Sequence, residues 1–143
     1  MTPAELLTVA REIQEQPSAT TAGIWPRAAA ILARQALEGA LDELWEASPD
    51  TRRLSDCTRR SQLACLPSYL DARTARQIAY VWSALSGACH YHAYELAPTT
   101  AELVGWIDIV DQLLTSIFHS PEGNADLPRD SWSIGADDSD DRR

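Results

Sequence analysis

Four long stretches of this 143-residue sequence repeat apolar side chains at intervals of three and four residues, which is the period of an α-helix. Breaks that contain proline separate several of these stretches. No segment of useful length alternates apolar and polar residues with the period of a β-strand. The pattern therefore predicts an all-α protein, and the short connections favour an antiparallel four-helix bundle.

The predicted helices begin and end at residues suited to those positions. Asp71 is a good N-cap for the third long helix, and Thr99 forms a capping box with Glu102 at the start of the fourth. The expected long helices cover residues 3–16, 25–47, 72–96 and 100–119, and a shorter helical piece covers residues 57–66. The buried stripe expected on the third long helix comprises Ile78, Val81, Trp82, Leu85, Cys89, His92 and Leu96.

The helical pattern stops at Pro121. Residues 121–143 combine low hydrophobicity with Pro, Gly and clustered Asp, which predicts a disordered acidic tail. We therefore expect one helical-bundle domain over residues 1–120, followed by this tail. Its aspartates are expected to favour solubility, or alternatively to fold over an arginine patch as a phosphate mimic. They are Asp137, Asp138, Asp140 and Asp141.

The formal net charge of -9 argues against broad, non-specific binding to nucleic acid, because phosphate repels an acidic surface. A local basic patch remains compatible with that charge. The candidate patch comprises Arg52, Arg53, Arg59 and Arg60. Guanidinium groups suit phosphate, so these are the candidate RNA-binding residues. The alternative is a solvated connector whose arginines pair with Asp50, Asp56 and helix carboxylates.

The three cysteines are Cys57, Cys65 and Cys89, and their odd number without CxxC spacing indicates a reducing cytosol. Cys57 and Cys65 are eight residues apart and do not form the ligand pair of a structural zinc site, so we expect no metal and no other cofactor. The first residues lack the basic segment of a secretory signal, and no apolar run has membrane-spanning length. The sequence thus predicts a cytoplasmic protein without membrane association.

The segment 85–99 concentrates groups that carry chemistry, including two of the three histidines. Histidine is the side chain best placed to exchange protons near neutral pH. On a helix, His92 falls on the apolar stripe, whereas His90 shares another face with Tyr94 and Gly87. The functional interpretation makes His90, His92 and Tyr94 catalytic candidates. The structural alternative is a hydrogen-bonded core position for His92 and a surface position for His90.

The helix order and the sequence His92-Ala93-Tyr94 resemble the HEPN superfamily, which comprises small helical bundles of prokaryotic toxin, phage-defence and RNA-processing systems. The resemblance covers residues 22–118. Many members carry on the third long helix an Arg, four to six residues and then a His, and one toxin branch adds a Tyr two positions later. The resemblance implies a four-helix bundle fold and a homodimer whose two motifs form one cleft.

In active members the resemblance implies a metal-independent ribonuclease. The His assists proton transfer, the Arg holds the scissile phosphate, and the ribose 2′-hydroxyl is the nucleophile. By this resemblance His92 transfers the proton and Tyr94 lines the cleft, where a cognate antitoxin or nucleotidyltransferase would modify it. The chain departs from the motif at Gly87, five residues before His92, and the nearest upstream arginine is Arg76.

This departure leaves several functions open. Without the guanidinium, a ribonuclease would have reduced or lost activity, unless another arginine, from the 52–60 cluster or from the partner protomer, enters the cleft. The alternative is a non-catalytic module that binds RNA or a protein partner, which Gly87 and the acidic surface favour. A third interpretation is a helical bundle that resembles the superfamily only through convergence on four helices.

Overall fold

The computed structural model describes residues 1–20, 22–90 and 96–118. Within these ranges every regular element is helical, so the prediction of an all-α chain is confirmed there. The predicted tail at 121–143 and the domain boundary beside it lie outside the described residues. The elements are α1 (Pro3–Glu15), α2 (Trp25–Glu46), α3 (Pro49–Arg52), α4 (Arg59–Cys65), the 3-10 helix η1 (Leu66–Ser68), α5 (Ala72–Cys89) and α6 (Thr100–Phe118).

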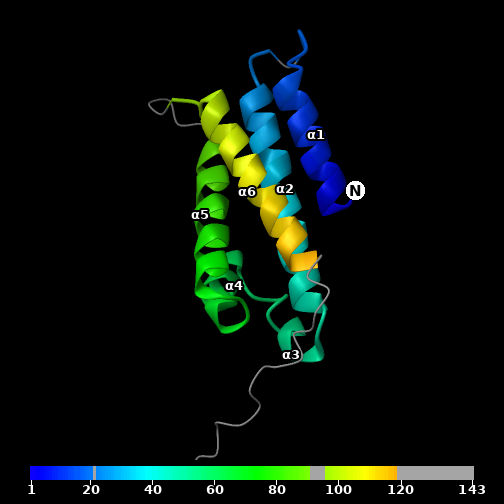
Figure 1. Cartoon of the computed structure of the whole chain (residues 1–143), viewed down its shortest axis with the longest axis vertical. Coiled ribbons are helices and arrows are strands. Elements are labelled where there is room, and N and C mark those ends of the chain that lie inside the picture. Colours follow the sequence, from blue (N-terminus) through cyan, green and yellow to red (C-terminus); the bar gives the residue numbers. More distant parts are fainter. Residues whose placement is uncertain (21, 91–95, 119–143) are drawn as a thin grey trace, which may run out of the picture.

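The four long helices lie alongside one another, and the chain can be followed through them in Figure 1. In this view it rises through α1, descends through α2, rises through α5 and descends through α6. The short helices α3 and α4 lie at the lower end, between the end of α2 and the start of α5. Helix α2 contacts α1, α5 and α6, and α6 likewise contacts α1, α2 and α5, so these two helices are common packing partners of the long helices.

Side chains that accept backbone hydrogen bonds start the long helices where the sequence predicted. Asp71 Oδ1 accepts the backbone N–H groups of Arg73 at 3.1 Å and Thr74 at 3.0 Å, which caps α5. At α6, Thr99 Oγ1 accepts the N–H of Glu102 at 3.2 Å, and the Glu102 carboxylate accepts the N–H of Thr99 at 2.8 Å. Both predicted caps are confirmed. They satisfy N–H groups that the first turn of a helix leaves without partners.

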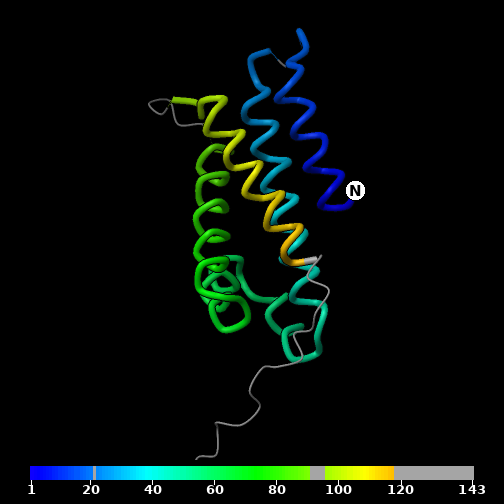
Figure 2. The backbone as a smooth tube through the Cα atoms, viewed as in Figure 1, coloured from blue at the N-terminus to red at the C-terminus, as the bar shows by residue number. Residues whose placement is uncertain are grey.

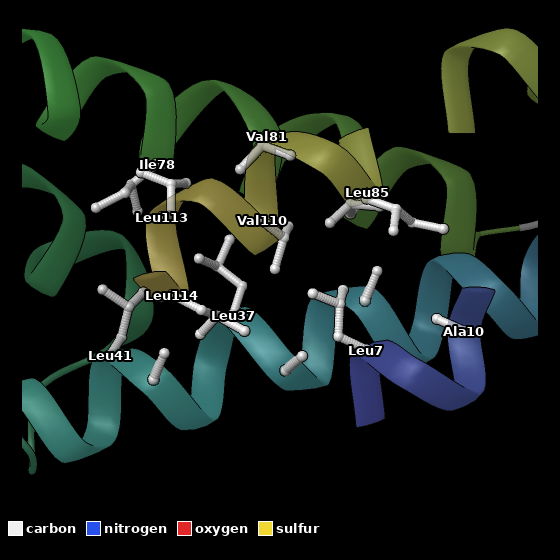
Figure 3. Packing of buried hydrophobic residues seen from close by; sticks show 14 of the residues in the cluster. Leu7, Ala10, Leu37, Leu41, Ile78, Val81, Leu85, Val110, Leu113 and Leu114 are labelled. Atoms are coloured by element: carbon white, nitrogen blue, oxygen red, sulfur yellow. The ribbon is translucent and has the colours of Figure 1, made fainter. Parts of the chain in front are cut away.

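The apolar faces of the long helices meet in one core, shown in Figure 3. Val81 of α5, Val110 of α6 and Leu37 of α2 point into the same interior, and none of them is exposed to solvent. Trp45 is also fully buried and packs edge-to-face on Tyr69, with ring centroids 5.4 Å apart. That aromatic pair fixes the lower end of α2 against the segment that enters α5.

Small side chains let α2 pack closely against its neighbours. Its fully buried alanines are Ala29, Ala30, Ala33, Ala36 and Ala40. At Gly39, a Cβ atom would lie 3.2 Å from Pro3 Cγ, which is closer than ordinary van der Waals contact. The start of α1 therefore lies almost on the backbone of α2, and glycine provides the room for that approach.

Two polar contacts fix the relative positions of helices that lie far apart in the sequence. Arg11 of α1 binds Asp108 at 2.9 Å and Asp111 at 3.1 Å on α6. Trp82 Nε1 of α5 donates to Glu38 Oε1 of α2 at 2.9 Å. The three charged residues of the first contact are partly exposed, so each ion pair contributes only about 0–1 kcal/mol. The main effect of these ion pairs is to set which helical turns of α1 and α6 face each other.

The third long helix is shorter than predicted. Helix α5 ends at Cys89, His90 has extended backbone angles (φ −92°, ψ 133°), and Leu96 is 98% exposed rather than buried. The apolar stripe in the sequence continues to Leu96, beyond the residue at which the helix ends, so apolar periodicity alone does not locate the end of α5.

We expect Leu85→Ala and Leu96→Ala to differ strongly in stability, although both leucines lie on the apolar stripe predicted from sequence. Leu85 is fully buried, so its truncation should lower the free energy of unfolding by about 2–5 kcal/mol. Leu96→Ala should change it by no more than about 0.5 kcal/mol. Urea unfolding followed by circular dichroism measures both values, and equal losses would contradict the exposed position of Leu96.

Acid should destabilise the protein partly through its helix caps. The Thr74 hydroxyl lowers the pKa of Asp71, and the backbone N–H of the N-cap threonine lowers the pKa of Glu5 and of Glu102. Because the pKa of each of these carboxyl groups is lower in the folded protein than in the unfolded chain, its charged form stabilises the fold. That stabilisation is fully present above the unfolded pKa, near pH 4, and is lost as the pH falls through the folded pKa.

The substitution Asp71→Asn separates capping from titration, because asparagine caps as well as aspartate but carries no acidic proton. We expect the variant to be less stable than the wild type near neutral pH, because it lacks the charge that the Thr74 hydroxyl and the helix N-terminus stabilise, and to lose less stability between about pH 5 and pH 3. Urea midpoints measured across that range test the expectation. An unchanged acid dependence would show that the Asp71 carboxylate does not contribute to it.

Candidate functional site

A pocket of about 250 Å³ lies between the start of α2, the end of α5 and the segment that leads into α6. Figure 2 shows these three parts of the backbone at the same, upper end of the molecule. We call this cavity the α2–α5 pocket. Its lining residues are Gly23, Ile24, Pro26, Arg27, Gly87, Ala88, His90, Leu96, Ala97 and Pro98. It therefore includes six residues of the segment 85–99 that sequence analysis singled out.

Arg27 and His90 are the ionisable residues that line the pocket. Arg27 is the third residue of α2, so the first helical turn positions its side chain at the pocket. His90 follows the last residue of α5, and its backbone N–H donates to the Gly87 carbonyl at 3.2 Å. Both side chains are exposed. Among the described residues that line the cavity, Arg27 and His90 are the ones with an ionisable side chain.

The pocket contains Gly87, the position at which the HEPN motif would have arginine. A Cβ atom built there meets no atom within 4 Å, and the residue is exposed in the last turn of α5. Packing therefore does not require glycine at this position. A Cβ atom can be added at this position without contact with a described neighbour, so the missing guanidinium is open to direct test by substitution.

A strip of polar side chains between α2 and α5 leads away from the pocket. Glu38 accepts the Trp82 indole hydrogen bond and lies 3.5 Å from Arg34 Nε, an ion pair without hydrogen-bond geometry. Ser86 lies one turn beyond Trp82 on α5, and its buried Oγ has no hydrogen-bond partner among the described residues. The strip orients α5 relative to α2 and so positions the pocket walls.

Cys89 ends α5 next to this strip but is a poor nucleophile. Burial raises the pKa of its thiol, and Glu38 adds to that effect, whereas Arg34 and Arg27 lower the pKa without reversing its direction. The thiol is therefore protonated near neutral pH, whereas nucleophilic cysteines depend on the thiolate. This end of α5 offers no cysteine chemistry.

The structure describes only one of the three predicted catalytic residues. His90 lines the α2–α5 pocket and is exposed, which agrees with the surface position expected for it from helix geometry. His92 and Tyr94 lie outside the described residues, so their proposed roles stay predictions. Because α5 ends at Cys89, the argument that a continuous helix sets their directions does not hold.

The predicted RNA-binding arginines lie at the opposite end of the molecule. They belong to α3, α4 and the residues between them, which lie at the lower end of the helices in Figure 1, whereas the start of α2 and the end of α5, which line the α2–α5 pocket, lie at the upper end. Helix α2 separates the two regions, and its 22 residues span about 33 Å. Within one protomer, none of Arg52, Arg53, Arg59 and Arg60 reaches the pocket.

Arg59 differs from the other members of its cluster because it is bound within the fold. Its guanidinium donates to Asp42 Oδ1 at 2.9 Å and to Gln62 Oε1 at 2.6 Å. Gln62 is 2% exposed, and its amide donates to the carbonyls of Leu54 at 2.7 Å and Cys57 at 3.3 Å. Arg59 therefore organises the connection between α3 and α4.

Arg52, Arg53 and Arg60 are exposed and form no ion pair with the described residues, so they stay candidates for phosphate contacts. Their exposed positions also fit the predicted alternative of a solvated connector.

Sequence reasoning missed Arg27, which lies 60 residues before Gly87 in the chain. One signal was available. The first turn of a helix favours acidic residues, and a cation there costs about 0.3–1 kcal/mol. Helix α2 has no acidic residue in its first turn and carries Arg27 instead. An arginine in an electrostatically unfavourable position is a reason to look for a ligand.

Other chemistry receives no support from the described parts of the chain. Among residues 1–20, 22–90 and 96–118, no three His, Cys, Asp or Glu side chains are placed to hold a metal ion. No helix in those ranges is long and apolar enough to cross a membrane. Comparison of the chain with protein-family models, curated protein sequences and solved structures found no significant match.

We expect Arg59→Gln and Arg60→Gln to separate a structural arginine from an exposed one. Arg59→Gln removes a charge-assisted hydrogen bond to the buried Gln62, so the free energy of unfolding should fall by about 1–3 kcal/mol. Arg60→Gln should change it by no more than about 0.5 kcal/mol. Urea unfolding of the two variants measures the difference, and equal stability would contradict the role assigned to Arg59.

Proposed function

We propose that this chain is a HEPN-like protein of a toxin, defence or RNA-processing system and that its substrate is RNA. The proposal includes an antiparallel four-helix bundle, which the alternating chain direction of α1, α2, α5 and α6 in Figure 1 supports. The observation that carries the functional part is the α2–α5 pocket. It brings Gly87 and His90, at the start of the motif segment, together with Arg27 from a distant helix.

The proposed reaction is metal-independent cleavage of the RNA backbone. The 2′-oxygen of the ribose attacks phosphorus, the bond to the 5′-oxygen of the next nucleotide breaks, and His92 transfers a proton in this exchange. Tyr94 lines the cleft, and His90 stands at its edge. Two copies of the chain pair so that both motif segments face one cleft. Arg52, Arg53 and Arg60 contact the RNA backbone away from the reacting phosphate.

Gly87 lowers the proposed activity. The transition state of phosphoryl transfer gathers negative charge on the phosphate oxygens, and a bidentate guanidinium stabilises that charge well. Loss of one such contact commonly reduces the rate by about a hundredfold or more. The wild-type chain is therefore a weak ribonuclease at most. A cognate antitoxin or nucleotidyltransferase would act on it through Tyr94.

A non-catalytic module that binds RNA or a protein partner is the second candidate function. Glycine at position 87 favours it because the site has space for a larger side chain and carries none. The net charge of -9 also favours a protein partner over a long nucleic acid, since phosphate repels an acidic surface.

We expect Gly87→Arg to create or raise metal-independent cleavage of single-stranded RNA, by about a hundredfold or more over the wild type. Gly105→Arg is the matched control. Gly105 is likewise an exposed helical glycine with no atom within 4 Å of a built Cβ, but it lies on α6 outside the pocket. Cleavage is measured in excess chelator, and a gain confined to position 87 supports the proposed site.

His92→Ala in the Gly87→Arg background should abolish the new cleavage. Cleavage that persists in this double variant would contradict the proposed role of His92. If Gly87→Arg remains inactive while the folded wild type binds RNA or a partner protein, the non-catalytic function is supported instead.

A further inference from the structure

We propose that two copies of this chain pair through the exposed face of α5 in an antiparallel arrangement, in which Arg73 of one copy lies beside Gly87 of the other. The inference deepens the proposed function, on which it rests for the role of the site, because it names the surface that joins the two copies. It also names a source for the positive charge that Gly87 does not provide. The pairing itself can be measured whether or not the protein cleaves RNA.

Helix α5 differs from the other long helices in its charge. The sequence carries a net charge of -9, so two copies repel each other wherever acidic residues meet. The other three long helices carry exposed acidic side chains, among them Glu12 of α1, Glu43 of α2 and Asp111 of α6. Helix α5 contains no acidic residue and exposes Arg73 and Arg76. Its outer face is therefore the long-helix surface on which a second copy meets the least repulsion.

The middle of this face carries an exposed aromatic side chain. Tyr80 is 59% exposed, and among the described residues it is the one exposed large apolar side chain that lies within a helix. Arg73, Tyr80 and Gly87 are spaced by seven residues, close to two helical turns, so they lie along one line of α5. Between Tyr80 and Gly87 are the small residues Ser83 and Ala84. Small side chains beside an aromatic one let a second helix approach closely.

The order of the residues along this face is complementary to itself. In an antiparallel pair centred on Tyr80, each residue faces the one that is equally far on the other side of the centre. Arg73 and Gly87 are each seven residues from Tyr80, so Arg73 of each copy is level with Gly87 of its partner. Arg76 is likewise level with Ala84. The cationic half of one face thus meets the uncharged half of the other twice, as a two-fold symmetric interface requires.

The end of α5 offers an incoming arginine both space and an opposite charge. A Cβ atom built at Gly87 meets no described atom within 4 Å, so a side chain from another copy can approach there. The C-terminus of an α-helix carries a partial negative charge that cations stabilise, and α5 has no basic residue in its last turn. Arg73 and Arg76 form no ion pair with the described residues, so both can contact a second copy.

The length of the contact predicts a weak dimer. The 14 residues from Arg73 to Gly87 span about 21 Å of helix. A contact of that length and one helix wide lies at or below the lower end of stable interfaces, which bury roughly 1,200 Å² or more. A crossing angle of about 20°, common in helix bundles, keeps the two ends of the contact together. We therefore expect a dimer whose population rises with protein concentration.

At the proposed site, this pairing supplies a guanidinium from the second copy. Gly87 lines the α2–α5 pocket, and Arg73 of the partner beside it would contact a phosphate held between the two copies. Arginines provided by a partner protein stabilise phosphoryl-transfer transition states in other enzymes. Two guanidinium groups can share one phosphate, so the pairing is compatible with the gain expected of Gly87→Arg.

Disulfide crosslinking of the full-length protein tests the arrangement, after the native cysteines at positions 57, 65 and 89 have been replaced by serine. For helix axes 8–10 Å apart, facing Cα atoms lie about 4–5 Å apart, which a disulfide can bridge. Tyr80→Cys should therefore form covalent dimers on mild oxidation. A mixture of Arg73→Cys and Gly87→Cys chains should form covalent heterodimers.

The single variants and a control define the direction of pairing. Arg73→Cys alone and Gly87→Cys alone should form few crosslinks, because identical residues lie about 21 Å apart in the antiparallel pair. Gly105→Cys, on the exposed side of α6, measures crosslinking by random collision. Absence of crosslinks for Tyr80→Cys would overturn the inference. So would single variants at 73 and 87 that crosslink as well as their mixture, since that result indicates a parallel contact.

Sedimentation equilibrium over a range of protein concentrations measures the pairing with the native cysteines in place. Tyr80→Ala should weaken the dimer about tenfold or more, as expected for an aromatic side chain at the centre of an interface. Thr8→Ala, on the exposed side of α1, should leave it unchanged. Both substituted residues are exposed, so both variants should unfold in urea at the wild-type midpoint. A dimer that Tyr80→Ala does not weaken contradicts the assigned surface.

The outcomes distinguish this inference from the proposed function. The predicted crosslinks, without RNA cleavage by the wild type or by Gly87→Arg, keep the interface and remove the ribonuclease. Cleavage by Gly87→Arg without these crosslinks keeps the ribonuclease and removes the interface. Where both are observed, Arg73→Gln should lower wild-type cleavage about tenfold or more, and Arg73→Lys should lower it less because the charge remains. Cleavage unchanged by Arg73→Gln would show that Arg73 does not supply the charge.

Discussion

The close packing of α2 against three other helices is the interaction on which the rest of the structure depends. Helix α2 contacts α1, α5 and α6, and its buried face consists largely of alanine. Small side chains shorten the distance between helix axes, so the larger leucines and valines of the neighbours fill the interior. The contact of Gly39 with Pro3 marks the limit of this approach. Bulkier residues on this face would push all three neighbours outward.

The same packing explains where the candidate site lies. Trp82 of α5 binds Glu38 of α2, and the end of α5 and the start of α2 both line one pocket. The chain must leave α5, reverse and enter α6 at that end. The α2–α5 pocket forms where these three segments meet, and it brings Arg27 to His90 and Gly87. Its position thus follows from where the helices stop rather than from any single motif.

The two groups of arginines in the molecule have different surroundings. Arg11 and Arg59 bind aspartates on other helices and hold the fold together. Arg27 stands at the opening of a pocket, in a helical position that disfavours positive charge. In a sequence with 12 basic and 21 acidic residues, Arg11 and Arg59 thus form ion pairs between helices.

Apolar periodicity and capping residues, which act locally, determined most of the helical architecture from sequence alone. Leu37, Val81 and Val110 are buried as their stripes predicted, and the caps at Asp71 and Thr99 are confirmed. The end of α5 was not determined by the apolar stripe, because the stripe continues to Leu96 whereas the helix ends at Cys89 and Leu96 is exposed. Tertiary structure decided that Arg27 meets His90, since two residues so distant in the chain become neighbours only when α2 and α5 pack together.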